Sequence, residues 1–482
     1  MKKRCLGGVG VLALALLLAS VALLAARVLQ RAVDRQVQQE MVLRNGSDTL
    51  RLWEEPPPPV YMQFYMFNVT NPAEILNGET PLVTEIGPYT YREQVPKVNV
   101  RILDNGTKVS FFNPRTYVFI PEKSVGDPQV DLIRTVNLPA VVAMEMAIAS
   151  GMSLPVEFLL LLYKEEMFSI HSVHEWLWGY NDKFLHAMHR IRPDVDPEFG
   201  FFNKMNGTDD GEYVVLSGEH SYKDFTRIVE WKGKDKLDWW TSPTSNMING
   251  TDGSSFHPLI DPEETIYIFA SDFCRSLYLT YEKYVTVKGI PAYRFVPPAS
   301  LYASGAINKN NAGFCVPAGN CPGAGVLNIS TCMKGVPILL SPPHFYQSDE
   351  KYVKDIDGMH PKKEDHETFL DINPTTGLLV RACKRLQINT YVRSLPGFFQ
   401  TGNIRTLVFP VIHLNESVLV DDDSAEKLKV ALFESSLLIS IPYIIMGLGV
   451  VFGVIFVVLA CRPFRPKEEA SEDERAPLIR TS

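Results

Sequence analysis

The sequence predicts an α+β membrane protein in which two apolar helices anchor one large domain built mainly of β-strands. Two uncharged runs, 5–26 and 437–460, are each long enough for a bilayer core, which needs about 20 helical residues. All Asn-x-Ser/Thr sequons lie between these runs, in a region rich in short alternating apolar segments bounded by turn residues. We therefore expect a glycosylated domain at residues 28–436, outside the cytosol.

The first span is placed at residues 5–27, after a cytosolic N-terminus at residues 1–4. Lys2, Lys3 and Arg4 also form a basic n-region, so a cleaved signal peptide is the alternative. The apolar run is longer than the usual h-region of about 7–15 residues, which favours a retained anchor. Either interpretation leaves the following domain on the same side of the membrane.

The second span is placed at residues 437–461, before a cytosolic tail at residues 462–482. Arg462, Arg465 and Lys467 follow it, as the basic residues of the N-terminus precede the first span. The positive-inside rule then puts both termini in the cytosol and the large domain in a lumen or outside the cell.

The sequons support this topology because none lies in a predicted cytosolic tail, and N-glycans are added only on the luminal side. The seven acceptor residues are Asn45, Asn68, Asn105, Asn206, Asn249, Asn328 and Asn415.

A third apolar stretch, 140–162, is predicted to be a broken helix within the domain. Glu145 and Glu157 disfavour a membrane span, since an acid near the middle of a span costs about 2.5–3.5 kcal/mol. Gly151 and Pro155 interrupt the helical pattern.

The remaining pattern of the domain is mostly strands and turns. Apolar spacing continues the first span as a helix over 28–41, and Asp423 to Glu426 resembles a capping box that opens a helix leading into the second span. Short strands are predicted at 60–68, 213–216, 265–269, 276–280 and 387–392.

Five cysteines lie in the domain, and an oxidising lumen predicts disulfides with one thiol left over. Cys315 and Cys321 can close a small loop that a Cys274–Cys332 bridge would enclose, but the sequence alone leaves the pairing open. Cys5 and Cys461, at the cytosolic ends of the spans, are candidates for S-acylation or simply small residues in helix ends.

The cytosolic tail contains Glu474, followed after three residues by Leu478 and Ile479. This acidic di-leucine spacing is typical of sorting signals that clathrin adaptor complexes bind. Two adjacent aliphatic side chains can fill paired apolar pockets when the tail is extended, and Pro477 favours extension of the residue before it.

Several classes of function lack support. Of all residues 46% are hydrophobic and 21% charged, with a net charge of −8 and no basic run for nucleic acid. His174-Glu175 and His366-Glu367 begin like a zinc protease motif, but neither is completed, so no enzyme is predicted. The acids and histidines of 357–371 could ligate a metal; a solvated loop is favoured because their spacing is irregular, and no metal site is assigned.

Long motifs spread over the domain resemble the class B scavenger receptor family. They are Phe67 to Pro72, Glu85 to Arg92, Ser271 to Arg275, Glu364 to Gly377 and Lys384 to Asn389. Residues 177–180, 238–240 and 246–253, with the tail signal, resemble its lysosomal branch.

The resemblance implies an antiparallel β-barrel-like domain crossed by a lipid tunnel, with an apical helical bundle at about 130–190. It also implies disulfides Cys274–Cys332 and Cys315–Cys321, with Cys383 unpaired. No cofactor is implied, apart from a lipid or sterol held in the tunnel.

The function implied is that of a receptor in lysosomal and late endosomal membranes. It would bind β-glucocerebrosidase, deliver it to lysosomes and release it at acidic pH. The alternative is a transporter or scavenger receptor for cholesterol or phospholipid acting through the tunnel. A homo-oligomer is compatible with either role.

The apical region is the expected partner site, because an exposed apolar helical patch commonly marks one. A helix buried in its own domain is the alternative. His171/His174 and His186/His189 are spaced as neighbours on a helix face, so protonation could separate an interface. The chain has no histidine between 145 and 170, where the mammalian members that it resembles have one implicated in pH sensing, and Ser150 occupies the position that resembles it. The cargo-binding and pH-switch candidates are Glu145, Ser150, Phe158, Leu162, His171 and His174.

Overall fold

The computed structural model describes residues 2–461, with side chains from residue 6 onwards. Its internal contacts divide the chain into two compact units. One comprises Met1–Arg35 and Val430–Ser482, and the other comprises Gln36–Lys429. The first unit contains the apolar helices and the second contains all seven sequons, so each is described by itself.

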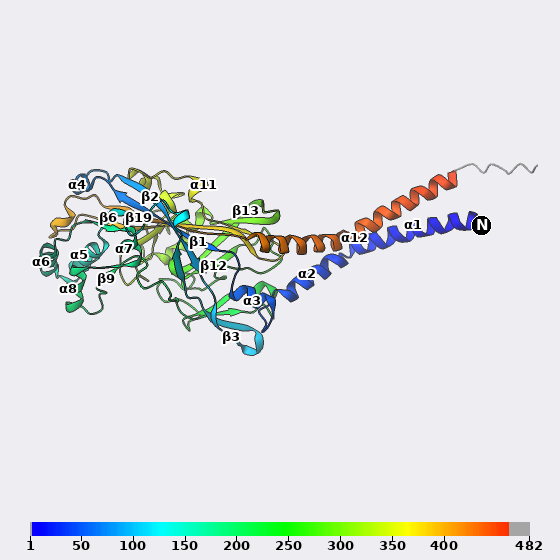
Figure 1. Ribbon diagram of the computed structural model, residues 1–482, viewed down its shortest axis with the longest axis horizontal. Coiled ribbons are helices and arrows are strands. Elements are labelled where there is room, and N and C mark those ends of the chain that lie inside the picture. Colours follow the sequence, from blue (N-terminus) through cyan, green and yellow to red (C-terminus); the bar gives the residue numbers. More distant parts are fainter. Residues whose placement is uncertain (1, 462–482) are drawn as a thin grey trace, which may run out of the picture. The chain divides into compact units, whose positions relative to one another are not determined.

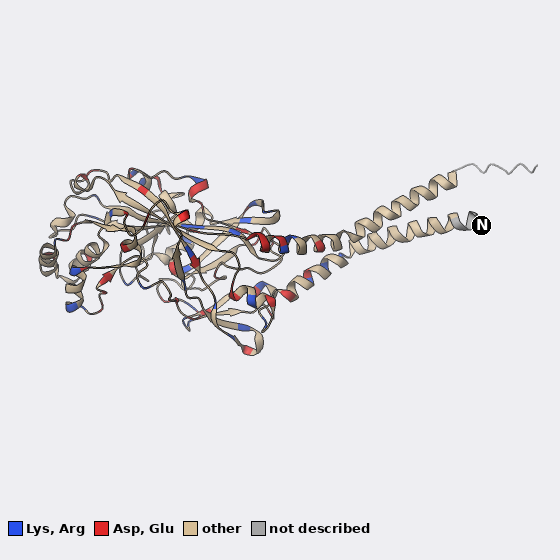
Figure 2. Cartoon of the chain, viewed as in Figure 1, with Lys and Arg blue, Asp and Glu red and all other residues tan. Residues whose placement is uncertain are grey.

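Helix α1 (Lys2–Ala25) and most of α12 (Asp422–Cys461) form the first unit, and both are long and apolar enough to cross a membrane. Figure 2 shows long stretches of both helices without charged residues. The helices also approach each other closely, because a Cβ built at Gly449 would lie 2.9 Å from the Leu17 side chain. Glycine therefore lets the two apolar helices pack together.

The second unit is built on an antiparallel sheet of eleven strands (Figure 1). The main path runs β12 (Ile266–Ala270), β13 (Arg275–Val287), β14 (Ile290–Val296), β17 (Phe369–Ile372), β18 (Leu379–Val392), β19 (Leu407–Leu419), β1 (Val60–Val69), β2 (Val83–Gln94) and β5 (Thr116–Phe119). The remaining two strands are β16 (Ile338–Ser341), which also pairs with β18, and β15 (Leu327–Asn328), which pairs with β16. All five short strands predicted from the sequence are confirmed. Three of them begin within one residue of the predicted start, and the other two are parts of the longer strands β13 and β18.

The long strands β18 and β19 form the centre of this sheet. β19 pairs along one edge of β18, while β17 and β16 follow one another along its other edge. Every residue of β19 from Leu407 to Leu414 is buried, so both faces of the sheet are covered there.

The predicted barrel is corrected to an open sheet. Its outer strands β12 and β5 pair only with β13 and β2 in the described part of the chain, so the sheet does not close on itself. A parallel bridge from Thr251 to Ile268 covers the free edge of β12. Short outer strands with a covered edge protect a sheet without closure.

Smaller sheets and short helices surround the main sheet. A four-stranded sheet has the order β11 (Ile228–Trp231), β10 (Tyr213–Leu216), β4 (Lys108–Phe112) and β3 (Val98–Leu103). Two pairs are β6 (Leu132–Val136) with β7 (Phe168–Ser172) and β8 (Tyr180–Asn181) with β9 (Glu198–Phe199). The other short helices are α3 (Asp48–Glu54), α4 (Pro72–Leu76), α9 (Ala299–Tyr302), α10 (Glu350–Lys354) and α11 (Lys363–His366).

Four helices gather at one end of the second unit (Figure 1): α5 (Leu138–Ser150), α6 (Ser153–Tyr163), α7 (Val173–Trp178) and α8 (Lys183–Ile191). The predicted broken helix is confirmed, and the break falls at Gly151. Its φ of +70° is a left-handed backbone conformation that glycine adopts more easily than other residues. Pro155 does not break the chain, because it lies in the first turn of α6, where no backbone donor is needed.

The helices at the two ends of the domain are present, but one predicted cap is wrong. The expected helix over 28–41 is α2 (Val28–Glu40). The capping box at Asp423 does not form. Helix α12 starts at Asp422, two residues before the start that a cap at Asp423 would give, and the Asp421 carboxylate accepts the Ser424 N–H at 2.9 Å. Each of the three consecutive aspartates at 421–423 could act as the N-cap residue, and the first of them does.

Candidate functional site

Four apolar side chains of α6 face solvent. Leu154 is 84% exposed, Phe158 65%, Leu161 55% and Leu162 58%. Their spacing places them along one side of the helix, while Val156 and Leu160 are buried on the opposite side. Because α6 is apolar on both sides, its outer face is a surface typical of a partner site.

This outer face, the α6 stripe of Leu154, Phe158, Leu161 and Leu162, rests on a packed support. Leu160 belongs to a core cluster that also contains Met144 of α5 and Phe184 and Met188 of α8. Sequence reasoning had singled out Phe158 and Leu162, and the structure adds Leu154 and Leu161. The helical spacing of these leucines was the signal that could have identified them.

Two other candidates lie near the end of α5. Glu145 accepts two hydrogen bonds from the Arg393 guanidinium, at 2.9 and 2.7 Å, so its carboxylate is already paired. Ser150 is exposed and donates its hydroxyl to the Met146 carbonyl at 2.7 Å. Both side chains are therefore already engaged within the domain, Glu145 by Arg393 and Ser150 by its own helix.

The predicted helical pair of His171 and His174 is wrong. His171 belongs to β7 and His174 to α7, because Ser172 caps α7 in a capping box with Glu175. The His171 ring stacks on Tyr180 with 3.7 Å between ring centres, and burial lowers the pKa of His171 although Glu175 opposes the shift. The Ser172-x-x-Glu175 pattern was visible in the sequence and marks this helix start.

The second histidine pair does lie on one helix. His186 and His189 are on α8, which packs against α6. His186 is exposed, with its Nε2 3.1 Å from Asn181 Oδ1, and His189 Nδ1 lies 2.6 Å from the Val195 carbonyl oxygen. These two histidines therefore lie on a helix that packs against the one carrying the α6 stripe, while their rings contact Asn181 and Val195.

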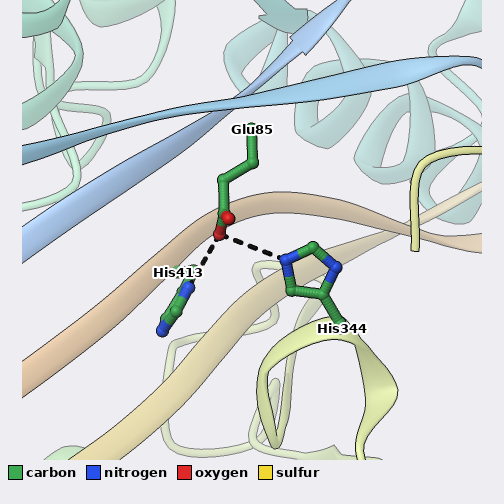
Figure 3. Close-up of side chains that lie close together, drawn as sticks. All are labelled: Glu85, His344 and His413. Atoms are coloured by element: carbon green, nitrogen blue, oxygen red, sulfur yellow. Dashed lines mark hydrogen bonds and ion pairs between the residues drawn. The ribbon is translucent and has the colours of Figure 1, made fainter. Parts of the chain in front are cut away.

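A buried histidine cluster that sequence reasoning did not assemble lies beside the main sheet (Figure 3). Glu85 of β2 points between His344 and His413, with Oε1 3.2 Å from His344 Nε2 and 2.8 Å from His413 Nδ1. The His366 ring stacks on His344 with 4.4 Å between ring centres. The four residues are distant in sequence, so no local spacing could have brought them together.

The cluster has the residue types of a metal site but not its donor set. The Nδ1 atom of His344 accepts the His360 N–H at 3.0 Å, so the neutral ring carries its proton on Nε2, towards Glu85. That nitrogen cannot also ligate a cation. Glu85 and His413 then offer two ligands, fewer than a zinc site uses. The arrangement fits a hydrogen-bonded network.

The network controls which of its members are charged. Burial would raise the pKa of Glu85, but hydrogen bonds from His344 and His413 outweigh it and lower that pKa to about 2. Burial, reinforced by His344 and His413, lowers the pKa of His366 to about 4. Burial also lowers the pKa of His413, against the opposing effect of Glu85. An ionised Glu85 carboxylate and neutral imidazoles at His366 and His413 are therefore favoured.

The two disulfides implied by the family resemblance are present in the structure, Cys274–Cys332 and Cys315–Cys321. Cys383 is a free thiol, half-buried on β18, and burial raises its pKa, which makes it unreactive. It lines a cavity of about 430 Å³ together with Tyr61, Val418 and Leu419. This volume is within the range of small-molecule sites.

The remaining candidates are sugar acceptors and the tail signal. No sequon falls within α5–α8, so none of the seven asparagines would carry a glycan on these four helices. Asn45, Asn105 and Asn206 are exposed, whereas Asn68, Asn249, Asn328 and Asn415 are partly buried. The sorting signal of Glu474, Leu478 and Ile479 lies outside the described residues.

The geometry can now be compared with known proteins. The model of the CD36 family matches residues 11–460, nearly the whole chain. The chain belongs to the CD36 family. This family member is 55% identical to lysosome membrane protein 2 of Rattus norvegicus and 53% identical to that of Homo sapiens. Each comparison covers 481 residues and 100% of both chains.

A more distant relative connects the chain to the scavenger receptors. Scavenger receptor class B member 1 of Mus musculus is 36% identical over 413 residues, 85% of this chain and 80% of that protein. The predicted family is thus confirmed. Full-length similarity to lysosome membrane proteins, with two candidate spans, identifies this CD36 family member as a lysosomal membrane protein with a receptor-type role.

Proposed function

We propose that this protein is a receptor that binds β-glucocerebrosidase in the early secretory pathway and carries it to lysosomes. The observation that carries the proposal is the exposed apolar α6 stripe on a rigid helical support. Such a face is costly to leave in water and fits a protein partner. The absence of sequons from residues 130–190 leaves it unshielded by sugars attached there.

Phe158 is the expected anchor of the interface. Its ring is large and largely exposed, and aromatic residues at the centre of an interface commonly carry more than 2 kcal/mol each, roughly thirtyfold in affinity. Binding of purified β-glucocerebrosidase to the full-length receptor at pH 7 tests this. We expect Phe158→Ala to weaken binding at least tenfold, with Ile307→Ala, an exposed apolar residue elsewhere, as the matched control. Equal affinity of Phe158→Ala and the wild type would overturn the assignment.

Release at acidic pH is assigned to α8. His186 and His189 are one turn apart on the helix that supports α6, so like charges on this pair would repel one another and act on the interface through α8. The receptor should bind cargo at pH 7 and lose it near pH 5. A His186→Gln/His189→Gln variant should retain cargo at pH 5. If this variant releases cargo as the wild type does, the pH switch lies in another group of the receptor or in the cargo itself.

Lipid transport is a second candidate function, supported by the cavity beside Cys383. Its volume of about 430 Å³ and its lining by Tyr61, Val418 and Leu419 suit part of a lipid or sterol. Sterol that copurifies with the full-length protein, and a loss of transfer in Ser417→Trp, which fills the cavity, would support this role. Unchanged transfer in that variant would remove the cavity from the lipid path. A continuous tunnel and its cholesterol or phospholipid cargo are part of the same proposal.

In this proposal the cytosolic tail supplies the destination. Clathrin adaptor complexes would bind Glu474, Leu478 and Ile479. Replacement of both aliphatic residues by Ala should move the receptor to the cell surface without changing cargo binding, which separates sorting from capture.

A further inference from the structure

A buried arginine without an acidic partner lies between the two disulfides. Arg275 follows Cys274 at the start of β13 and is only 3% exposed. Its guanidinium lies over the Phe314 ring, with Cζ 3.3 Å from the ring centre. Among the described residues, no acceptor is hydrogen-bonded to its buried Nε, and no carboxylate forms an ion pair with it or shifts its pKa.

Two partly buried guanidinium groups of this domain are balanced by acids. Arg294 donates two hydrogen bonds to the Asp371 carboxylate, at 2.7 and 2.8 Å, and Arg115 lies 2.9 Å from Asp272. Contact with one aromatic ring offsets only part of the cost of removing a guanidinium from water. Arg275 therefore lacks a counter-charge that comparable residues have.

The charge on Arg275 persists at physiological pH. Burial lowers the pKa of Arg275 to about 9, while Tyr302 and Tyr278 act in the opposite direction. At pH values of about 5 to 7 the arginine is therefore still protonated. The protein itself thus provides a fixed positive charge in a dry setting.

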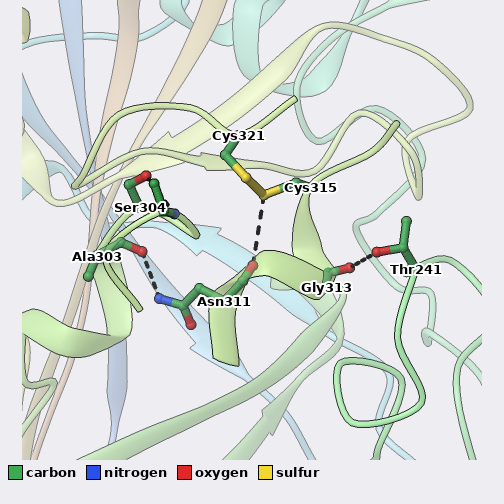
Figure 4. The surroundings of a disulfide bond; sticks show 8 residues. Thr241, Ala303, Ser304, Asn311, Gly313, Cys315 and Cys321 are labelled. Carbon is green, nitrogen blue, oxygen red and sulfur yellow. Dashed lines mark hydrogen bonds between the residues drawn. A yellow bond between two sulfur atoms is a disulfide. The ribbon is translucent and has the colours of Figure 1, made fainter. Parts of the chain in front are cut away.

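Arg275 lines a small cavity of about 30 Å³ whose walls are well fixed. The Cys315–Cys321 disulfide forms one wall of the cavity (Figure 4). The Asn311 side-chain amide donates a hydrogen bond to the Ala303 carbonyl at 2.7 Å, which connects two further lining segments. Gly305 packs so closely that a Cβ there would lie 2.9 Å from Cys321 Sγ. A water needs about 10–15 Å³ of such space, so the cavity holds one monatomic ion or two waters. A phosphate ester or a lipid is too large.

We propose that this cavity is a binding site for a small monovalent anion of the halide class, chloride in a cellular lumen, held by the guanidinium of Arg275. The anion supplies the missing counter-charge and accepts hydrogen bonds from donors that the protein leaves unpaired. It joins β13 to the loops around both disulfides, so it stabilises the folded domain without taking part in cargo binding.

Chloride should therefore raise the thermal unfolding temperature of the full-length protein. A ligand that binds only the folded state raises the folded-to-unfolded ratio about elevenfold at tenfold excess over its Kd. The experiment is a titration of the detergent-solubilised protein with sodium chloride, compared with sodium gluconate at equal ionic strength. Gluconate is too large for the cavity, and bromide serves as a halide control.

We expect a saturable rise with chloride and bromide but none with gluconate. The rise should disappear in Arg275→Gln and remain in Arg227→Gln, an exposed arginine paired with Asp224. An equal response to chloride and gluconate, or an unchanged chloride response in Arg275→Gln, would overturn the proposal. If that variant does not fold, the ³⁵Cl NMR linewidth of the wild type decides: saturable broadening that bromide displaces supports the site, and no broadening contradicts it.

Discussion

Replacement of His366 by Gln should reduce the loss of stability that the protein suffers on acidification. The His366 ring is 6% exposed and lies against His344. Its Nδ1 accepts the Lys362 N–H at 2.9 Å, so protonation of that nitrogen must break a backbone hydrogen bond. These contacts hold the ring neutral in the folded state, and the pKa of His366 is lowered to about 4.

The sign and size of the effect follow from this pKa. An unfolded histidine has a pKa of about 6.5, so between that pH and about 4 the unfolded chain binds a proton that the folded chain does not. The free energy of unfolding therefore falls as pH falls through this window. At pH 5 the loss attributable to His366 is about 2 kcal/mol relative to neutral pH.

The assay is denaturant unfolding of the wild type and His366→Gln at pH 7 and pH 5. Gln can still accept the Lys362 N–H but cannot titrate. The difference in unfolding free energy between the two pH values should be about 2 kcal/mol smaller in the variant. His186→Gln is the matched control, because its ring is exposed and accepts no backbone N–H. An identical pH dependence in wild type and His366→Gln would refute the reasoning.

Two further predictions concern the stability of the domain. Cys274→Ser/Cys332→Ser opens a loop with a sequence separation of 58 and should lower the free energy of unfolding by about 4 kcal/mol through chain entropy. Cys315→Ser/Cys321→Ser opens a loop with a separation of 6 and should lower it by about 2 kcal/mol. Denaturant unfolding measures both losses, and a larger loss in the second variant would contradict the prediction. Asp371→Ala leaves two arginines unpaired around a fully buried position and should cost about 3–5 kcal/mol, measured in the same way; a cost below about 1 kcal/mol would show that water replaces the carboxylate.

Much of the fold was predictable because it depends on local pattern. Alternation located β1, a short apolar run bounded by turn residues located β10, and the uncharged runs located the two long helices. Gly151 marked the break between α5 and α6 because few other residues adopt its backbone conformation readily. These features are determined by residues within a few positions of each other.

The errors arose where the outcome depends on distant residues or on competing caps. The sheet is open because its outer strands β12 and β5 do not pair with each other in the described part of the chain, and no local strand pattern reveals this. Asp421 caps α12 in preference to Asp423, although both have the required side chain. The histidine cluster was missed because tertiary packing alone brings its members to Glu85.

The most direct test of the receptor account is delivery of β-glucocerebrosidase in cells that lack the endogenous receptor. Full-length wild-type protein and Phe158→Asp are expressed at equal levels, and lysosomal β-glucocerebrosidase activity is measured together with the position of the receptor. Because Phe158 is exposed, the substitution should leave folding and lysosomal arrival of the receptor intact. The account predicts a receptor that reaches lysosomes without its enzyme. Delivery by Phe158→Asp equal to the wild type would contradict it.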